Sequence, residues 1–496
     1  MSKWSTYPLV YEINTWVWLN DLSQETGRPV TLGNVPQVEL ERLAGYGFDA
    51  LWLMGVWQRS PGSREVAQTH PDLQAEYHRV LPDCTPKDVI GSPYAIYNYR
   101  VDPVLGGDKE LAALRQRLQR LGQSLILDFV PNHLAVDHPW LEQHPRRLVQ
   151  GDPASLAREP GNYFGSKAGG QRGVFAHGRD PNFGGWSDTV QLDYRRSETR
   201  RAMSEILLAI AERCDGVRCD MAMLVTRDVF LRTWGGEFDP PQAEFWPAAI
   251  TCVKTNHPDF LMLAEAYWDL EWELQQQGFD YAYDKRLYDH LLEGDATLVR
   301  LHLHAELDYQ RHLARFVENH DERRALDAFG SQRSRAVAVL ALTLPGLRLL
   351  HEGQLEGRRL RLPVQLGRRP PELPEPGQEP FYRRLLVALR HPVFHDGHWQ
   401  LLTPQEGWPG NPSYRNFEAH CWVLGEERRL VVVNLSLDRA QCFLPLGLQA
   451  LTGRSWHLQD LLSDARYVRD GDDLLARGLY LDMSGYGCHL FDLLPA

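Results

Sequence analysis

The sequence predicts a (β/α)8 barrel with an insertion after its third strand and a C-terminal antiparallel β-sandwich domain. Over about the first 390 residues, short and mostly continuous apolar runs alternate with amphipathic segments. This alternation is typical of parallel strands that helices cover on both faces. A stretch rich in Gly and Pro interrupts the alternation after the third run, and the helical period disappears from about residue 393 onward.

The apolar runs have the length and composition of buried strands. Each is too short for a typical helix and lies between turn-forming residues, which favours a strand over a buried helix. The eight predicted strands are Leu9–Val17, Phe48–Met54, Ser124–Val130, Gly216–Asp220, Phe260–Ala264, Phe279–Tyr283, Ala314–Val317 and Leu347–Leu350.

Amphipathic segments separate these runs. The clearest reads K-E-L-A-A-L-R-Q-R-L-Q-R-L, with leucines at 111, 114, 118 and 121. This spacing places the leucines on one face of a helix. The predicted helices are Val38–Tyr46, Lys109–Leu121, Glu198–Glu212, Ala248–Asn256 and Ser334–Leu344.

The irregular regions divide the chain into domains. Residues 131–190 hold nine Gly and six Pro with few apolar runs, and an insertion this long at a strand's carboxyl end is expected to be functional or a small subdomain. We therefore expect a catalytic barrel over 1–130 and 191–392, an insertion subdomain over 131–190, and a β-domain over 393–496.

Composition excludes several functional classes. Lys and Arg number 53 against 65 Asp and Glu, a net charge of −12, so no basic excess is available to bind a nucleic acid. No stretch approaches the roughly 18 apolar residues of a membrane helix, and the N-terminal residues lack the pattern of a secretory signal. The seven cysteines have no C-x-x-C spacing, which suits free thiols. We expect a cytoplasmic protein with neither a nucleic-acid nor a membrane partner.

Carboxylates stand at the ends of four predicted strands. Asp128 lies near the end of strand three, Asp220 ends strand four, Glu265 directly follows strand five, and Glu318 and Asp321 follow strand seven. The carboxyl ends of barrel strands converge on one face, so we expect these side chains to meet. One such residue is as readily a salt bridge to a neighbouring Arg, but four strands in succession favour a functional site.

A cluster of carboxylates suits a hard metal ion or a reaction with a cationic transition state. Hydrolysis of a glycosidic bond is such a reaction, because it uses one carboxylate as nucleophile or base and one protonated carboxyl as acid. Arg218, two residues before Asp220, points to the same side of the strand and would keep Asp220 ionised. Glu265 would need a raised pKa from burial and like-charged neighbours.

Four separated motifs give the chain a resemblance to a known family. They are Asp128-x-x-x-Asn132-His133, Gly216-x-Arg218-x-Asp220, Glu265 after an apolar strand, and Asn319-His320-Asp321. In this order, the chain resembles the α-amylase family of retaining glycoside hydrolases and transglycosidases over nearly its whole length. The resemblance implies a carbohydrate substrate.

The resemblance also implies a role for each matched residue. It implies that Asp220 is the nucleophile, Glu265 the general acid/base and Asp321 the stabiliser of the transition state. On the residues alone, each histidine would instead be read as a structural residue and Tyr94 as part of the core. Tyr99, Trp186 and Trp268 are further candidates to face a sugar. The substrate-binding residues that the resemblance implies are Tyr94, Asp128, His133, Arg218 and His320.

The chemistry itself needs no cofactor. The resemblance implies a structural Ca²⁺ near Asn132 and Asp193, whose positions hold one in many members of the family. One departure concerns the residues after the nucleophile. Hydrolases of the family that act on starch usually carry Lys and His where this chain has Met223 and Leu224, so the polar contacts to the leaving sugars are changed.

These observations favour a retaining glycosidase that hydrolyses α-glucosidic bonds in α-glucans or maltooligosaccharides. A transglycosidase with the same catalytic residues is the nearest alternative, because the motifs do not fix the acceptor. A non-catalytic amylase-like scaffold and a metal-dependent hydrolase that uses the acidic cluster are the others. The motifs determine neither the linkage nor the oligomeric state.

Overall fold

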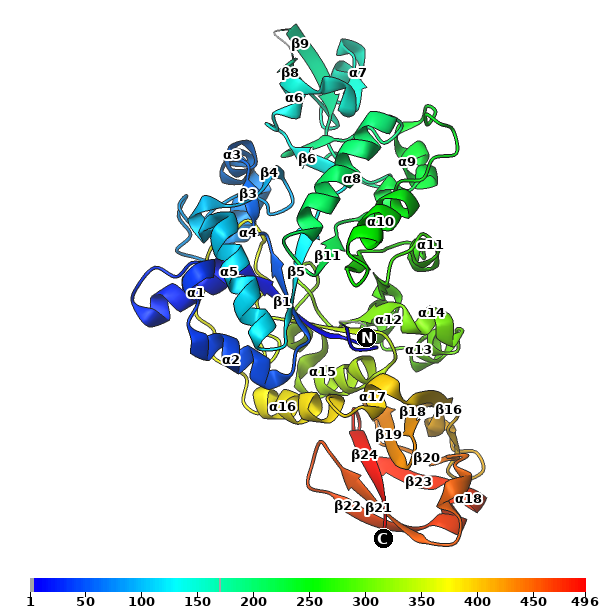
Figure 1. Cartoon of the computed structure of the whole chain (residues 1–496). Coiled ribbons are helices and arrows are strands. Elements are labelled where there is room, and N and C mark those ends of the chain that lie inside the picture. The colour runs from blue at the N-terminus through cyan, green and yellow to red at the C-terminus, as the bar shows by residue number, and fades with distance from the viewer. Residues whose placement is uncertain (1–3, 169–170) are drawn as a thin grey trace.

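A computed structural model of the chain describes residues 4–168 and 171–496. Eight parallel strands close into a barrel in the order β1-β15-β14-β13-β12-β11-β5-β2, and helices surround it (Figure 1). This arrangement confirms the predicted fold class. The barrel strands are β1 (Leu9–Asn14), β2 (Ala50–Met54), β5 (Ser124–Phe129), β11 (Gly216–Cys219), β12 (Leu261–Ala264), β13 (Tyr281–Tyr283), β14 (Leu313–Arg315) and β15 (Leu347–His351).

The first strand ends earlier than predicted. The Asn14 side chain accepts a hydrogen bond from the backbone N–H of Val17, and Asn is a favoured helix N-cap. Helix α1 (Thr15–Thr26) therefore begins where the apolar run still continues. The apolar run alone does not distinguish a long strand from a strand followed by a buried helical turn.

The predicted helices are present, and four of them differ from the prediction by at most three residues at either end. The last begins nine residues before the predicted Ser334 and is kinked at Gly330. In α5 the leucines 111, 114 and 118 are buried, as their spacing predicts. The corresponding helices are α2 (Gln37–Tyr46), α5 (Gly107–Arg120), α8 (Ser197–Ala211), α10 (Phe245–Asn256) and α15 (Ala325–Thr343). Others are α9 (Arg227–Trp234), α11 (Glu271–Gln276), α12 (Lys285–Glu293), α13 (Ala296–Leu303), α14 (Leu307–Arg311), α16 (Gln378–Leu389) and α17 (Val393–Asp396).

A helical segment that the sequence analysis does not predict follows β2. It has a small hydrophobic core of Ala67, Tyr77, Leu81, Val89 and Leu366. Leu366 belongs to the loop after β15, so the second and the eighth strands send their loops to the same place. The elements of this segment are β3 (Trp57–Arg59), α3 (Pro61–Thr69), α4 (Pro71–Val80) and β4 (Ile96–Val101).

The insertion after β5 forms small sheets at one end of the barrel, opposite the C-terminal domain (Figure 1). Residues 169 and 170 of it lie outside the described residues. His133 pairs with Gln191 in a two-stranded ladder directly after β5, which places His133 at the carboxyl end of the barrel. The elements are β6 (His133–Ala135), α6 (Trp140–Gln143), β7 (Gln150–Gly151), α7 (Pro153–Arg158), β8 (Tyr163–Ala168), β9 (Gln171–Ala176) and β10 (Thr189–Gln191).

The C-terminal domain consists of a six-stranded and a three-stranded antiparallel sheet around a core of their apolar residues. It packs on α15: the indole N–H of Trp422 donates to the Thr343 carbonyl at 2.8 Å. Its strands are β16 (His398–Leu402), β17 (Gln405–Glu406), β18 (Phe417–Leu424), β19 (Glu427–Asn434), β20 (Ala440–Leu444), β21 (Ser455–Asp460), β22 (Arg466–Asp470), β23 (Leu479–Met483) and β24 (Cys488–Pro495).

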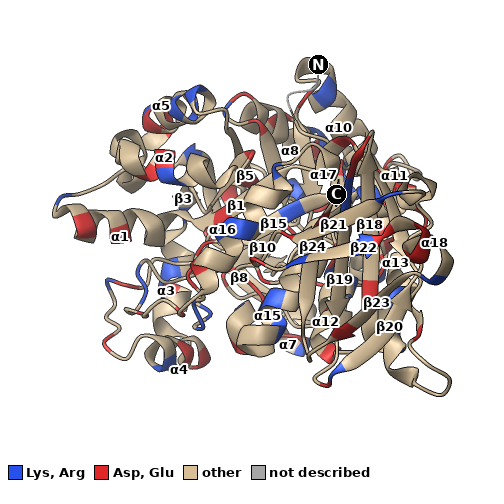
Figure 2. Cartoon of the chain, turned by 90° about the horizontal axis from the view of Figure 1, so that it is seen from below, with Lys and Arg blue, Asp and Glu red and all other residues tan. Residues whose placement is uncertain are grey.

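The charged residues, the cysteines and the helices can be compared with the predictions made from composition. Basic and acidic residues are interspersed along the chain rather than gathered by sign (Figure 2). All seven cysteines are free thiols. Within residues 4–168 and 171–496, no helix combines the length and the apolar character needed to span a bilayer.

Candidate active site

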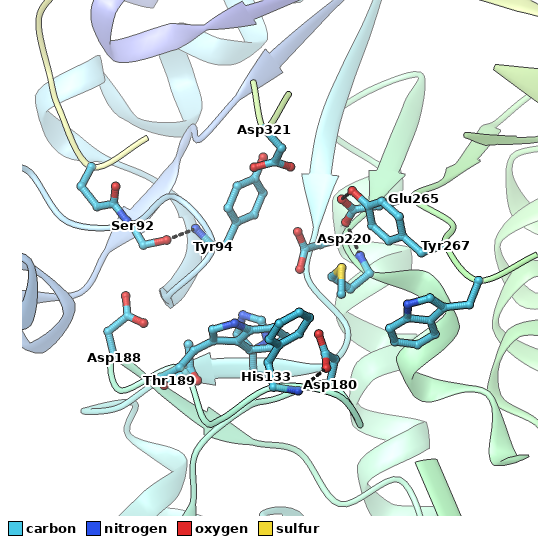
Figure 3. A pocket seen from close by; sticks show the side chains of 15 residues that line it. Ser92, Tyr94, His133, Asp180, Asp188, Thr189, Asp220, Glu265, Tyr267 and Asp321 are labelled. Atoms are coloured by element: carbon cyan, nitrogen blue, oxygen red, sulfur yellow. Dashed lines mark hydrogen bonds between the residues drawn. The ribbon is translucent and has the colours of Figure 1, made fainter. Parts of the chain in front are cut away.

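The carboxyl ends of the barrel strands open into a cavity of about 480 Å³. Asp220 directly follows β11, Glu265 directly follows β12, and Asp321 lies in the loop after β14. All three line this cavity (Figure 3). The tertiary structure therefore brings together the three carboxylates that the sequence analysis predicts as catalytic. Other predicted residues that line the cavity are Tyr94, His133, Trp186 and Trp268.

One guanidinium group holds two of the carboxylates. Arg218 Nη1 lies 2.7 Å from Asp220 Oδ1, and Arg218 Nη2 lies 2.8 Å from Glu265 Oε2. Arg218 is completely buried, and its guanidinium lies 5.3 Å from the centre of the Tyr94 ring. Arg218 is not among the residues that line the cavity, so the structure places it against the two carboxylates and behind the cavity surface.

The environment of Glu265 suits a general acid. The Tyr267 hydroxyl donates a hydrogen bond to Oε1 at 3.0 Å, and the backbone N–H of Met221 donates one to Oε2 at 2.6 Å. Burial raises the pKa of Glu265 to about 7, with Asp220 and Asp321 acting in the same direction and Arg218 against them. Glu265 therefore keeps a proton to donate near neutral pH.

Asp321 has the opposite tuning. Burial acts to raise its pKa, but His320 overcomes this effect and lowers the pKa of Asp321 to about 2. Its Oδ2 lies 3.0 Å from Nε2 of His320, and its side chain remains 43 % exposed because it opens into the cavity. The carboxylate is therefore ionised, accessible and able to accept hydrogen bonds from sugar hydroxyls.

His320 is held as a cation by carboxylates on both sides. Burial opposes its charge, but Asp321 and Glu12 raise the pKa of His320 well above its ordinary value. Glu12 in β1 hydrogen-bonds Nδ1, while the Tyr94 hydroxyl lies 2.6 Å from Nε2. Its ring stacks on that of Tyr94, with centroids 5.4 Å apart. His320 thus fixes both Tyr94 and Asp321 at the cavity.

His133 and the aromatic candidates are divided between cavity and core. Burial lowers the pKa of His133, so it is neutral at pH 7, and the Trp186 ring packs 5.1 Å from it. Trp268 lines the cavity with 39 % of its surface exposed. Tyr99 instead packs against Trp57 at 5.6 Å and bonds the Val130 carbonyl at 3.0 Å, so it supports the barrel.

Two strand-end carboxylates lie outside the cavity, which corrects the expectation for them. Asp128 is fully buried and accepts hydrogen bonds from the Trp52 indole at 3.0 Å and the Gly55 backbone at 2.8 Å. It therefore joins β5 to β2 and does not line the cavity. Glu318 is paired with Arg324 at 2.7 Å, the salt bridge that the sequence analysis weighed for a single such residue.

Several residues at or near the site are not predicted from the sequence. Glu12 could have been identified, because a carboxylate inside a buried strand is unfavourable without a partner. Met221 lines the cavity and adopts a left-handed backbone at φ 42°, which no pattern indicates. By contrast, Met223 and Leu224 are buried in the core and are not in the cavity lining. Tyr267 stands two residues beyond Glu265 without a motif to identify it.

The side chains proposed for Ca²⁺ do not fit a cation site. Both oxygens of Asp193 bind Arg195, at 2.7 Å to Nε and 3.0 Å to Nη2. Asn132 Oδ1 accepts a hydrogen bond from Gln191 at 2.9 Å. The guanidinium group of Arg195 thus binds both oxygens of the carboxylate that a cation would need as a ligand. Across the described residues, no three His, Cys, Asp or Glu side chains are grouped as metal ligands.

The chain is similar to known α-glucan enzymes. Over 256 residues it is 26 % identical to the alpha-amylase MalA of Haloarcula japonica, covering 48 % of this chain and 32 % of that protein. Over 241 residues it is 27 % identical to an alpha-1,4-glucan:maltose-1-phosphate maltosyltransferase of Bifidobacterium longum, covering 46 % and 25 %. The first curated relatives are matched over 32 % to 55 % of their length, so the chain spans at most about half of them.

The fold agrees with these similarities. The crystal structure of a noncanonic maltogenic alpha-amylase, AmyB, from Thermotoga neapolitana superposes with a TM-score of 0.69, over 99 % of each chain at 19 % identity. The family model of the alpha amylase catalytic domain matches residues 37–359, which is more than half of the chain. The chain therefore belongs to the α-amylase family of glycoside hydrolases and transglycosylases.

Proposed function

We propose that the protein is a retaining α-glucosidic enzyme that hydrolyses α-1,4-linked glucans or maltooligosaccharides by double displacement. Asp220 attacks the anomeric carbon as the bond to the glycosidic oxygen breaks, and the Glu265 carboxyl gives its proton to that oxygen. The resulting glucosyl ester on Asp220 is then attacked by water. Glu265 takes a proton from this water, and Asp220 leaves as a carboxylate.

The observation that carries this proposal is the guanidinium of Arg218 between Asp220 and Glu265, at 2.7 Å and 2.8 Å. A contact from one guanidinium to both acids favours a short separation between them. An inverting enzyme needs roughly 6.5–9.5 Å between its two carboxyl groups to admit a water, and a retaining enzyme needs only about 5–5.5 Å. The raised pKa of Glu265, about 7, supports its role as the acid.

The charge of the cavity supports an uncharged substrate. Among the described residues that line it, five are carboxylates (Asp180, Asp188, Asp220, Glu265 and Asp321) and none is Lys or Arg. The relative from B. longum transfers from a maltose phosphate by its name. A phosphate group in this cavity would meet like charge without a cationic partner, which is unfavourable. A neutral gluco-oligosaccharide fits better.

A transglycosidase remains the second candidate, because the same residues would activate a sugar hydroxyl in place of water. Chromatography of the products from pure maltotetraose distinguishes the two. Shorter sugars alone support hydrolysis, and longer or rearranged oligosaccharides support transfer. The first products should be α-anomers by NMR in either case, and release of β-anomers would contradict the assignment of Asp220 as nucleophile.

The Asp220→Asn variant tests catalysis itself. We expect turnover to fall by several orders of magnitude with the circular dichroism spectrum unchanged, because the nucleophile is lost. Asp482→Asn is the matched control, since Asp482 pairs with Arg439 on the C-terminal domain far from the cavity. Full activity in Asp220→Asn would contradict the proposed mechanism and support a metal-dependent mechanism or another nucleophile. If the wild type turned over no α-glucoside, the non-catalytic binding scaffold would be the supported alternative.

A further inference from the structure

The two ends of the cavity are built differently, and the difference bears on how the substrate enters. Glu265 gives its proton to the leaving oxygen in the proposed mechanism, so the leaving sugars lie on the Glu265 side. C4 of the attacked ring lies across the ring from C1 and therefore points away from Glu265. Figure 3 shows Ser92 and Tyr94 on one side of Asp220, with Glu265 and Tyr267 on the other. The chain on the non-reducing side of the attacked sugar would thus run toward Ser92.

Two loops meet on that side, and we call them the donor-side wall: residues 86–92, before β4, and residues 362–368, after β15. The backbone N–H of Ile90 donates to the Gln365 carbonyl, and that of Gly367 donates to the Asp88 carbonyl, each at 2.8 Å. Val89 and Leu366 form an antiparallel bridge and are both buried in the small core beneath it. The wall is therefore a packed structure rather than two separate loops.

Guanidinium groups tie the wall together from several directions. Arg368 binds Asp88 at 2.6 Å and Asp83 at 3.2 Å. Arg59 is buried and donates to the carbonyls of Gly91 and Val364, one from each loop. Charge-assisted bonds of this kind are stronger than neutral ones. Opening the wall to admit more sugars would break these bonds together.

Two residues of the wall line the cavity. Ser92 and Gln365 line the same cavity as Asp220, and Ser92 stands two residues from Tyr94, which the resemblance implies to be a substrate-binding residue. Ser92 accepts the backbone N–H of Tyr94 at 3.1 Å. The amide of Gln365 has no protein partner in the described chain, so it is available to a hydroxyl of the terminal sugar as donor or acceptor.

The Glu265 side has an exposed ring instead of a wall. Trp268, in the loop that Glu265 begins after β12, lines the cavity with 39 % of its surface exposed. An exposed ring of this kind presents flat apolar surface to a ligand. Sugars on the leaving side would have this surface to pack against, whereas sugars beyond the attacked ring on the other side would meet the wall.

We propose that the donor-side wall makes the enzyme exo-acting: it binds a neutral α-glucan by the non-reducing end and detaches one terminal glucosyl unit at a time. This inference rests on the proposed function, because it uses Asp220 and Glu265 as nucleophile and acid to orient the sugar. It adds the class of substrate, short maltooligosaccharides with a free non-reducing end, and the first product, glucose or a singly transferred glucosyl unit.

Two forms of one substrate test the inference. Full-length enzyme is given maltoheptaose carrying a 4-nitrophenyl group at the reducing end, either free or bridged by an ethylidene group across O4 and O6 of the terminal glucose. We expect glucose or glucosyl transfer as the first event with the free form, and a rate at least 100-fold lower with the blocked form. Cleavage of both forms at similar rates overturns the inference that the donor-side wall makes the enzyme exo-acting, but it leaves the proposed function intact. Cleavage of neither form, with 4-nitrophenyl α-glucoside also inert, overturns the proposed function and the inference with it.

A variant of the wall gives a second readout. Gln365→Ala should raise KM for maltotriose about tenfold with kcat nearly unchanged, because it removes a contact made equally in the ground and transition states. Gln405→Ala, in strand β17 of the C-terminal domain, is the matched control. Unchanged KM in Gln365→Ala with a melting temperature equal to that of the wild type would overturn the assignment of Gln365 to the terminal sugar.

Discussion

Glu12, in the first barrel strand, hydrogen-bonds Nδ1 of His320, which lies 308 residues later in the chain. Glu12 is fully buried, and its Oε2 has no hydrogen-bond partner. An unpaired carboxylate oxygen at such a position is costly. The cost is consistent with a single task, which is to keep the imidazole of His320 protonated where it contacts Asp321 and Tyr94.

Glu12→Gln tests this task. The substitution keeps the shape but removes a charge that raises the pKa of His320, so His320 should lose its proton at a lower pH. The fall of kcat/KM on the alkaline side should then follow two deprotonations, with a limiting slope of −2 in the log plot where the wild type has −1. Measuring kcat/KM for maltotriose as a function of pH gives this slope. Glu12→Asp, which keeps the charge, is the control, and an unchanged slope in Glu12→Gln would contradict the role of Glu12.

The wild type should lose activity as Glu265 loses its proton. The pKa of Glu265 is raised to about 7, chiefly by burial, and the general acid must be protonated to assist the leaving oxygen. We therefore expect kcat/KM to level off a pH unit or more below 7, to begin falling near pH 7 and to fall tenfold per pH unit well above it. An alkaline limb near pH 5 would mean that the carboxyl acts with an ordinary pKa.

Tyr267→Phe should move that limb upward. The Tyr267 hydroxyl donates to Glu265 Oε1 at 3.0 Å, and a donor to a carboxylate stabilises its charged form. Removing the donor makes the proton of Glu265 harder to lose, so the alkaline limb shifts to higher pH. The profile of kcat/KM again measures the shift. A limb displaced to lower pH would show that the hydroxyl instead accepts a hydrogen bond from the protonated Glu265 carboxyl.

Phe183→Ala should weaken binding without affecting the fold. Phe183 is 72 % exposed at the cavity, so its ring contributes little to the core. Loss of an aromatic contact of about 1–1.5 kcal/mol corresponds to a rise in KM of up to roughly tenfold, with kcat nearly unchanged. Trp408→Ala is matched as a control, because Trp408 is 51 % exposed on the C-terminal domain. Equal kinetics of both variants would remove Phe183 from the binding site.

Chelation should leave the stability of the protein unchanged. Asp193 is bound at both oxygens by Arg195, whose Nη1 also approaches the Gly235 carbonyl at 3.3 Å. We expect the same melting temperature in EDTA and in calcium. Arg195→Met should lower the free energy of unfolding by up to about 3 kcal/mol, since it leaves Asp193 buried without its main partner, and Arg195→Lys should restore part of it. A melting temperature that falls in EDTA would reinstate a structural cation.

Much of the barrel follows from local pattern. Eight apolar runs at βα spacing indicate the strands, because parallel strands buried on both faces need continuous apolar sequence. The carboxylates that end them are equally visible, since a charge at the end of such a run requires a reason. Asp220, Glu265 and Asp321 therefore stand out together with Asp128 and Glu318, and it is the resemblance to the α-amylase family that implies catalytic roles for the first three.

Local pattern thus predicts the barrel and the carboxylates at the ends of its strands, because both depend on neighbours along the chain. The tertiary structure separates these carboxylates: Asp220, Glu265 and Asp321 line the cavity, whereas Asp128 and Glu318 bind Trp52 and Arg324. It also joins Glu12 to His320, 308 residues apart, and brings loops from the second and eighth barrel strands together. A sequence carries no local pattern for such distant contacts, because they depend on how the barrel closes.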